Sequence, residues 1–262
     1  MAKTTISLAV EDRVARVILD RPDIRNAFND VMLAELLDTF QSLGRREDVR
    51  VVVMTGSGNA FCAGADMNWM RKVKDYTHEE NLRDSLVLAD CLYAIYSCAK
   101  PTVARVNGAA IGGGLGLAAA CDVTVASSEA VFGFSEVKIG VVPACISPYV
   151  VRRIGEAASR ELFLTGERFS APKALQVGLV NQVAQPSELD EAVQQRAHQL
   201  LSSAPQALKA CKELLEKVPG MDLAQAKAYT AEMIATLRRS PEAQEGMAAY
   251  LEKRKPSWTK AD

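Results

Sequence analysis

The sequence has few histidines, no paired cysteines and no excess of charge of either sign. His78 and His198 are its only two histidines, too few for a histidine-based metal site. Its 31 basic and 32 acidic residues give a net charge of −1. The overall field therefore gives no reason to expect binding to nucleic acid or to a membrane surface. A negatively charged ligand would need a local cluster of basic side chains.

Disulfides and membrane spans are also not expected. None of the six cysteines lies in a C-x-x-C pair, and six are too few for a disulfide scaffold in 262 residues. No apolar run approaches the roughly 18 residues that a membrane-spanning helix needs. The first residues show neither a signal core nor a transit peptide, so we expect a cytoplasmic protein or a processed organellar chain. We expect reduced, buried thiols at Cys62, Cys91, Cys98, Cys121, Cys145 and Cys211.

The chain has enough apolar residues for a large α/β core. Hydrophobic residues make up 48 % of the 262 residues, which fits one large domain or a domain with a small appendage. Short β-branched runs alternate with helical patterns in the first two-thirds, which predicts βαβ units and a largely parallel sheet. We expect strands at residues 13–19, 49–55, 102–106, 122–126 and 179–183, and helices at 31–43 and 81–97.

The last part of the chain carries helical patterns alone. We expect helices at residues 188–203, 205–218, 222–239 and 240–254, with proline or a capping residue at their starts. The sequence therefore predicts an α/β core at residues 1–185 and an all-helical part at 186–262. No flexible linker separates the two parts, so the helices should pack on the core or on a neighbouring subunit.

Two loops with small residues each follow a predicted strand and precede a predicted helix. In residues 58–67, the small side chains of Ala63, Gly64 and Ala65 would let a ligand approach the backbone closely. An ordinary strand-to-helix loop would look the same. In residues 107–122, three consecutive glycines, 112–114, open a helix of small residues. Free N–H groups at such a helix start stabilise negative charge.

The second loop also imitates a dinucleotide-binding motif. Residues 114–119 satisfy G-x-G-x-x-A, with Glu136 about 20 residues further on. That motif belongs to the first βα turn of a Rossmann unit, whereas strands and helices already precede it here. A nucleotide-dependent dehydrogenase is therefore the weaker interpretation.

Glu136 stands among apolar neighbours in residues 130–143. Partial desolvation would raise the pKa of its carboxyl group and suit it to proton transfer. A surface glutamate on an irregular strand is the alternative. Lys138 would share its face if the chain were extended there. Trp69, in the predicted helix after the first loop, would flank a ligand pocket or simply pack in the core, and Asp122 would cap or brace the glycine-rich helix.

Together these segments resemble the crotonase (enoyl-CoA hydratase/isomerase) superfamily over nearly the whole chain. The resemblance implies an α/β fold, a spiral of ββα repeats with an all-helical C-terminal part that forms a homotrimer or homohexamer. The substrate would be an acyl-CoA thioester, and no cofactor is implied beyond the CoA in the substrate. Further supporting motifs are Arg21-Pro22, Asn26-Ala27-Phe28, Lys100-Pro101, Phe163-Leu164-Thr165-Gly166-Glu167, Gly178-Leu179-Val180 and Glu252-Lys253-Arg254-Lys255-Pro256.

The resemblance also assigns the site residues. The backbone N–H groups of Ala65 and Gly113 would form an oxyanion hole for the thioester oxygen, and Glu136 would be the acid–base group. The substrate-binding positions implied by the family are Arg25, Ala27, Ala63, Asp66, Met67, Gly112, Tyr250 and Lys253.

The sequence departs from the family at one catalytic position. The familiar hydratases carry two glutamates, and the first of them matches Gly116. Enoyl-CoA isomerases use a single base, yet residues 135–150 look most like bacterial methylglutaconyl-CoA hydratases and the related geranoyl-CoA branch. We therefore expect hydration of a short or branched 2-enoyl-CoA first, and Δ3,Δ2-enoyl-CoA isomerisation second. An RNA-binding or scaffold role on the same fold is the weakest alternative, because the sequence lacks a basic stripe with interleaved aromatic residues.

Overall fold

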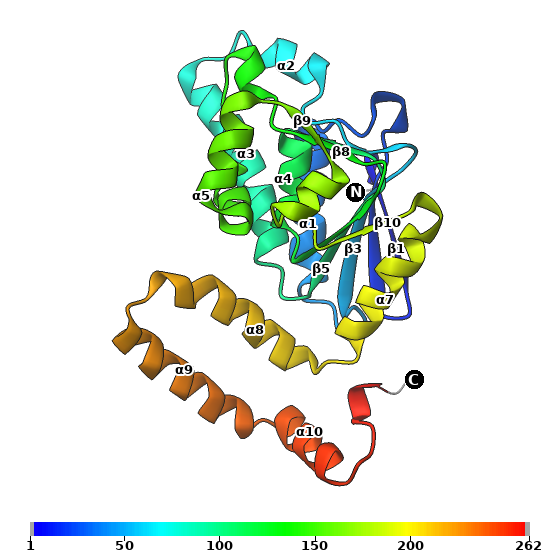
Figure 1. Ribbon diagram of the computed structural model, residues 1–262, viewed down its shortest axis with the longest axis vertical. Helices are drawn as coiled ribbons and strands as arrows, with labels where there is room; N and C mark the ends of the chain where they lie inside the picture. The colour runs from blue at the N-terminus through cyan, green and yellow to red at the C-terminus, as the bar shows by residue number, and fades with distance from the viewer. Residues whose placement is uncertain (1–2, 260–262) are drawn as a thin grey trace.

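The computed structural model describes residues 3–259, which form two β-sheets with helices packed around them (Figure 1). The larger sheet has the order β1-β2-β3-β5-β7-β10, and all its neighbouring strands are parallel except the β1–β2 hairpin. Its strands are β1 (Ile6–Glu11), β2 (Val14–Leu19), β3 (Val51–Gly56), β5 (Thr102–Val106), β7 (Val123–Ser127) and β10 (Gln182–Ala184).

Most strands of the smaller sheet come directly after a strand of the larger sheet in the chain. It contains β4 (Ala60–Cys62), β6 (Ala109–Ile111), β8 (Val131–Gly133) and β9 (Arg168–Ser170), in that order. Strand β4 follows β3, β6 follows β5 and β8 follows β7, and each of these pairs leads into helical structure. This repetition confirms the predicted spiral of ββα repeats.

Helices cover both sides of the larger sheet. On one side α1 (Asp30–Leu43) packs on α3 (His78–Tyr96), α3 on α4 (Gly113–Ala120), and α4 on α5 (Ser147–Thr165). On the other side α7 (Leu189–Leu201) covers β3, β5 and β7. Strand β3 is buried along its whole length because both of its faces are covered. Two short helices, α2 (Met67–Val73) and α6 (Ala171–Gln176), complete the α/β part of the chain.

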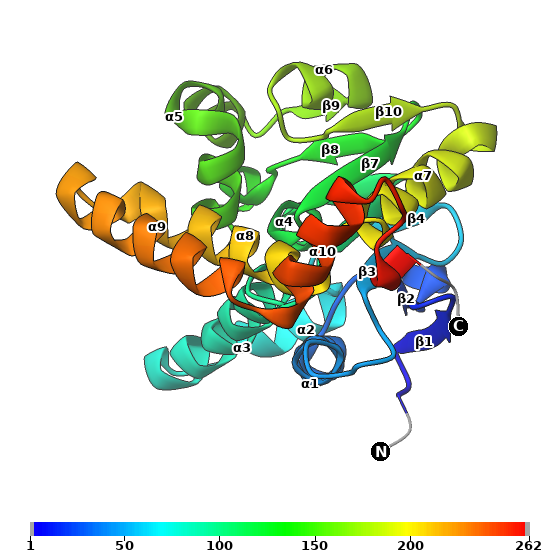
Figure 2. The same ribbon diagram turned by 90° about the horizontal axis from the view of Figure 1, so that it is seen from below.

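After β10 the described chain is helical. Helices α8 (Pro205–Lys217), α9 (Leu223–Arg238) and α10 (Pro241–Leu251) form an arm that extends beyond the α/β core (Figures 1 and 2). The side chains of Asp222 and Ser240 cap α9 and α10 as the sequence predicts. Arg50 ties both ends of the arm to β3, because it donates to the carbonyls of Ser203 at 2.5 Å and Trp258 at 2.8 Å. The division into domains at 1–185 and 186–262 stays a prediction.

Several expectations about local structure are wrong. The strand expected at 179–183 begins only at Gln182, because Gly178 takes a left-handed φ of +82° and sends Leu179 into the core. The helix expected to reach residue 254 ends at Leu251, since Lys253 has a φ of +53°. Of the six free cysteines, Cys211 is exposed and Cys145 is half-buried.

Asp122 braces two elements and does not cap the glycine-rich helix. Its carboxylate accepts hydrogen bonds from the backbone and hydroxyl of Thr102 in β5, and it pairs with Lys212 of α8 at 2.5 Å. Within residues 3–259, no helix is both long and apolar enough to cross a bilayer.

Candidate active site

The three segments singled out in the sequence follow three adjacent parallel strands. Ala65 comes after β4, Gly113 after β6 and Glu136 after β8, and β4 pairs with β6, which pairs with β8. The carboxyl ends of parallel strands lie along one edge of a sheet, and ligands of α/β proteins bind at such edges. The fold therefore brings these three residues, 71 positions apart in the chain at most, to one edge.

The backbone N–H of Ala65 is left free by an isolated bridge to Phe28. The N–H of Phe28 donates to Gly64 and the N–H of Asp66 donates to Phe28, both at 2.8 Å. This parallel pairing turns the N–H of Ala65 away from Phe28. Among residues 3–259, no acceptor takes that N–H.

The N–H of Gly113 is free because it lies at the first position of α4. The N–H groups of the first helical turn have no partner within a helix, and the structure records no other acceptor for this one in its described residues. Gly112 makes the turn possible with a φ of +52°. Its own N–H donates to the carbonyl of Gly133 in β8 at 2.9 Å, which ties the start of α4 to the neighbouring strand.

Phe28 holds these two N–H groups together, a role that the sequence did not reveal. It pairs with Ala65 through its backbone, and a Cβ on Gly113 would lie 2.6 Å from its ring. Phe28 is 2 % exposed, and Trp69 packs edge-on against it at a centroid distance of 5.7 Å. Its place in the Asn26-Ala27-Phe28 motif was the only available signal.

Glu136 opens the 3-10 helix η2 (Glu136–Ile139) and turns its carboxylate toward Gly112. A Cβ on Gly112 would lie 3.2 Å from Oε1 of Glu136. Oε2 is buried, and no group in the described part of the chain donates to it. Burial raises the pKa of Glu136, as the sequence predicts. Such a carboxylate, set beside free N–H groups, can take and return a proton.

Lys138 does not share a face with Glu136. The expectation assumed an extended chain, but both residues lie in η2. A 3-10 helix has three residues per turn, so side chains two residues apart point in different directions. Lys138 is exposed. Trp69 is half-buried and donates from Nε1 to Asp84 in α3 at 3.1 Å, so it joins α2 to α3 while it packs on Phe28.

Two predicted substrate-binding residues, Asp66 and Met67, lie at the start of α2, directly after Ala65. Asp66 accepts hydrogen bonds from the Asn68 N–H at 2.8 Å and from Arg21 at 2.7 Å. Burial acts to raise the pKa of Asp66, but these hydrogen bonds outweigh it and lower the pKa. The carboxylate of Asp66 therefore shapes the loop, while the side chain of Met67 is 72 % exposed.

The turn that carries Arg25 and Ala27 adjoins this loop at Ala63. The N–H of Ala63 donates to the carbonyl of Arg25 at 3.0 Å, and the side chain of Arg25 is exposed. Ala27 is buried, and its carbonyl accepts a hydrogen bond from Arg21 at 2.6 Å. These contacts leave the Arg25 guanidinium at the surface beside the residues that follow β4.

The structure does not bring Tyr250 and Lys253 to the other predicted residues. Tyr250 lies in the last turn of α10 and Lys253 lies just after that helix, on the arm, whereas α2 lies at the opposite end of the molecule (Figure 1). Tyr250 is 84 % exposed. Within one chain these two residues cannot join the site.

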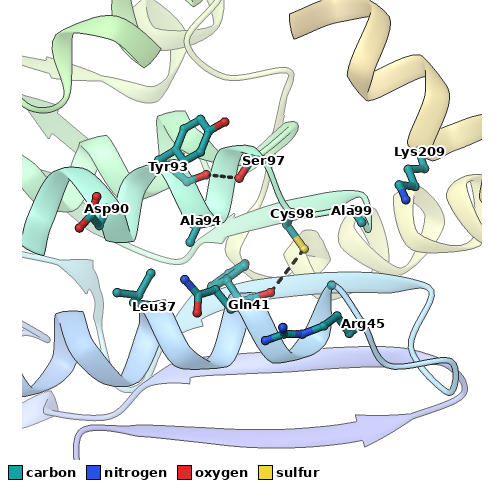
Figure 3. A pocket seen from close by; sticks show the side chains of 12 residues that line it. Leu37, Gln41, Arg45, Asp90, Tyr93, Ala94, Ser97, Cys98, Ala99 and Lys209 are labelled. Carbon is teal, nitrogen blue, oxygen red and sulfur yellow. Dashed lines mark hydrogen bonds between the residues drawn. The ribbon is translucent and has the colours of Figure 1, made fainter.

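A separate hollow of about 760 Å³ lies between α1, α3 and α8. Figure 3 shows Leu37 of α1, Tyr93 of α3 and Lys209 of α8 around it. None of the predicted site residues lines it.

The sequence and fold match one known family. Residues 9–261 match the family described as enoyl-CoA hydratase/isomerase. The crystal structure of an enoyl-CoA hydratase from Shewanella pealeana has 40 % sequence identity and a TM-score of 0.94, and the match covers 98 % of this chain and 96 % of that one. Pseudomonas aeruginosa AtuE has 34 % identity and a TM-score of 0.95, with 98 % and 100 % covered.

A curated relative agrees with these structures. The short-chain-enoyl-CoA hydratase of Clostridium acetobutylicum is 32 % identical over 257 residues, which cover 97 % of each chain. This protein therefore belongs to the enoyl-CoA hydratase/isomerase family, and the crotonase resemblance of the sequence is confirmed.

Proposed function

We propose that this protein adds water across the C2=C3 double bond of a short or branched 2-enoyl-CoA. The observation that carries the proposal is the pair of free N–H groups at Ala65 and Gly113 beside the buried carboxylate of Glu136. The hydratases among the relatives support the same reaction.

The two N–H groups would hold the thioester oxygen of the substrate. Negative charge grows on this oxygen when a nucleophile attacks C3, because the electrons of the double bond move toward the carbonyl. Each fixed donor of this kind typically stabilises the transition state by about 2.7–4 kcal/mol. Backbone donors suit this task because the bridge to Phe28 and the start of α4 hold them in place.

Glu136 would carry the proton. In its ionised form the carboxylate orients a water molecule and takes one of its protons as the oxygen attacks C3. That proton, or one from a second water, then reaches C2 as the enolate collapses, so the product has gained one water in total. Since position 116 is glycine, Glu136 would act without the second carboxylate of the two-glutamate hydratases.

The CoA part of the substrate would lie along the loop after β4. Ala63 to Met67 allow close approach, with Arg25, Ala27 and Gly112 adjoining, and Arg25 is placed to meet a phosphate. Tyr250 and Lys253 would reach the CoA only from a neighbouring copy, in a homotrimer or homohexamer. No cofactor is needed beyond the CoA that the substrate carries, and we expect the reaction to take place in the cytoplasm.

Incubation with a panel of 2-enoyl- and 3-enoyl-CoAs, with products separated by chromatography and identified by mass, tests this function. Hydration adds the mass of one water to a 2-enoyl-CoA. Products of unchanged mass from 3-enoyl-CoAs alone would replace hydration with isomerisation. A panel that is left unchanged in all its members would contradict both.

A further inference from the structure

The turn that carries Glu136 has little support of its own. No residue of η2 is buried, and Ser135 before it makes no capping hydrogen bond with its side chain. The turn is closed from within, because the carbonyl of Glu136 accepts from the N–H groups of Gly140 and of Val141, the latter at 3.2 Å. Its position relative to the rest of the protein therefore depends on the elements that pack beside it.

The end of α5 lies directly against η2. Gly166 caps α5 with a left-handed φ of +59°, and its N–H donates to Leu162 at 3.2 Å. A Cβ on Gly166 would lie 2.8 Å from Cγ2 of Val137 and 3.0 Å from Cε of Lys138. The side chains that follow Glu136 therefore rest on a glycine that has no room for a side chain of its own.

The residues after Gly166 support the chain on the other side of Glu136. Arg168, the first residue of β9, pairs with Gly133, the last residue of β8. The carbonyl oxygen of Glu167 lies 3.3 Å from the place where a Cβ on Gly133 would be. Residues 166–168 thus brace the chain both before Glu136, at Gly133, and after it, at Val137 and Lys138.

We propose that Gly166 is a positioning residue for the reaction, because its missing side chain seats η2 and so places the carboxylate of Glu136 beside Gly112. The inference rests on the proposed function, in which Glu136 is the acid–base group. The space for this carboxylate is narrow, because Oε1 of Glu136 lies only 3.2 Å from the point where a Cβ on Gly112 would be. Small displacements of reacting groups are costly, and a shift of about 1 Å can lower a rate about 100-fold.

The direct test is Gly166→Ala, assayed on the best enoyl-CoA across a range of pH. The added methyl should push Val137 and Lys138 away and displace Glu136. We expect kcat to fall about tenfold or more with little change in KM. The acidic limb of the kcat profile should move to lower pH, because a displaced carboxylate is more accessible to water and its pKa falls toward the ordinary value.

Gly178→Ala is the matched control for backbone strain. Gly178 also has a left-handed φ, of +82°, but the nearest atom to an added Cβ is the carbonyl oxygen of Arg153 at an unstrained 3.5 Å. Both variants should lower the melting temperature, and only Gly166→Ala should change kcat and the acidic limb. Wild-type kinetics in Gly166→Ala, or the same loss in both variants, would overturn the proposal.

Val137→Ala tests the same contact without a strained backbone. It removes Cγ2 from the face of Gly166, so alone it should loosen η2, lower kcat and shift the acidic limb. In the double variant with Gly166→Ala it makes room for the added methyl, so the effects on kcat should not be additive. Additive effects would overturn the proposal. If Gly166→Ala gives no soluble protein, wild-type kinetics of Val137→Ala would overturn it instead.

Glu136→Gln separates this proposal from the function on which it rests. If Glu136→Gln keeps its activity, both are overturned. If Glu136→Gln is inactive while Gly166→Ala and Val137→Ala behave like the wild type, only the positioning role of Gly166 is lost.

Discussion

The side chain of Ile146 occupies the space into which any side chain at Gly116 would project. A Cβ on Gly116 would lie 2.8 Å from Cβ of Ile146, with Leu92 3.6 Å away on α3. Ile146 is 2 % exposed, so it has no open space into which it can turn. The position that the family resemblance matches to the first glutamate of two-glutamate hydratases therefore faces a hydrocarbon side chain.

Gly116→Glu should lower both stability and hydration. Forcing the new side chain against Ile146 costs about 1–3 kcal/mol through overpacking, and burial of the added carboxylate adds to that cost. Urea unfolding measures the first effect and the rate of hydration of a straight-chain enoyl-CoA the second. The double variant with Ile146→Gly should recover part of the stability. A Gly116→Glu protein as stable as the wild type would contradict this view of the pocket.

Glu136 should make the folded protein less stable as pH rises. Burial raises its pKa in the folded state, so the folded state holds this proton more tightly than the unfolded state does. The stabilisation is complete below the unfolded pKa and is lost as pH rises through the folded pKa. Glu136→Gln should therefore be more stable than the wild type at neutral pH. Urea unfolding of both proteins at acidic and neutral pH checks this, and identical dependences on pH would contradict it.

Phe28→Leu should damage catalysis more than its effect on stability suggests. The smaller side chain leaves a space beside Gly113, so the two N–H groups can move relative to one another. Phe40→Leu is the control, because Phe40 is equally buried but lies within α1, whereas Phe28 pairs with Ala65 and contacts Gly113. Thermal unfolding should show similar losses for both variants, while kcat should fall about tenfold or more only for Phe28→Leu. Equal values of kcat would remove Phe28 from the catalytic account.

Lys253→Ala should raise KM with kcat unchanged, and it should make KM less sensitive to salt. The reason is that a surface cation attracts a phosphate equally in the ground and transition states. Lys227→Ala, on the exposed surface of α9, is the control for a change of charge on the arm. Sedimentation should give the mass of three or six chains, since Lys253 can reach a site only in a neighbour. A single-chain mass at micromolar concentration would contradict both expectations.

The sequence predicted most of the long helices and central strands, but not the 19-residue helix α5 or strand β1. The helices α1, α3 and α7–α10 were visible in their 3.6-residue period and their caps, and the glycines at 112–114 marked the start of α4. The strands β4, β6, β8 and β9 were not visible, because three residues each are too few to show alternation. The family resemblance, and not the residue pattern, supplied the ββα repeat.

The site could be predicted only in part, because much of it depends on contacts between distant segments. The small residues around Ala65 and Gly113 indicated these two loops in the sequence, and the apolar neighbours of Glu136 indicated the catalytic carboxylate. That Ile146 blocks position 116, and that Gly166 lies under η2, depends on segments about 30 residues away. No local pattern records such contacts, and no pattern distinguished a 3-10 turn from an extended chain at Lys138.

The most direct test of the account is the turnover of Glu136→Gln on the best enoyl-CoA substrate. Glutamine keeps the shape and hydrogen-bonding reach of the side chain but cannot take the proton. Turnover should fall about 10²–10⁴-fold, the usual share of general acid–base catalysis, while calorimetry with acetyl-CoA should show little change in affinity. A variant that keeps more than about a tenth of wild-type turnover would contradict the account, because the proton transfer assigned to Glu136 would then contribute too little to the barrier.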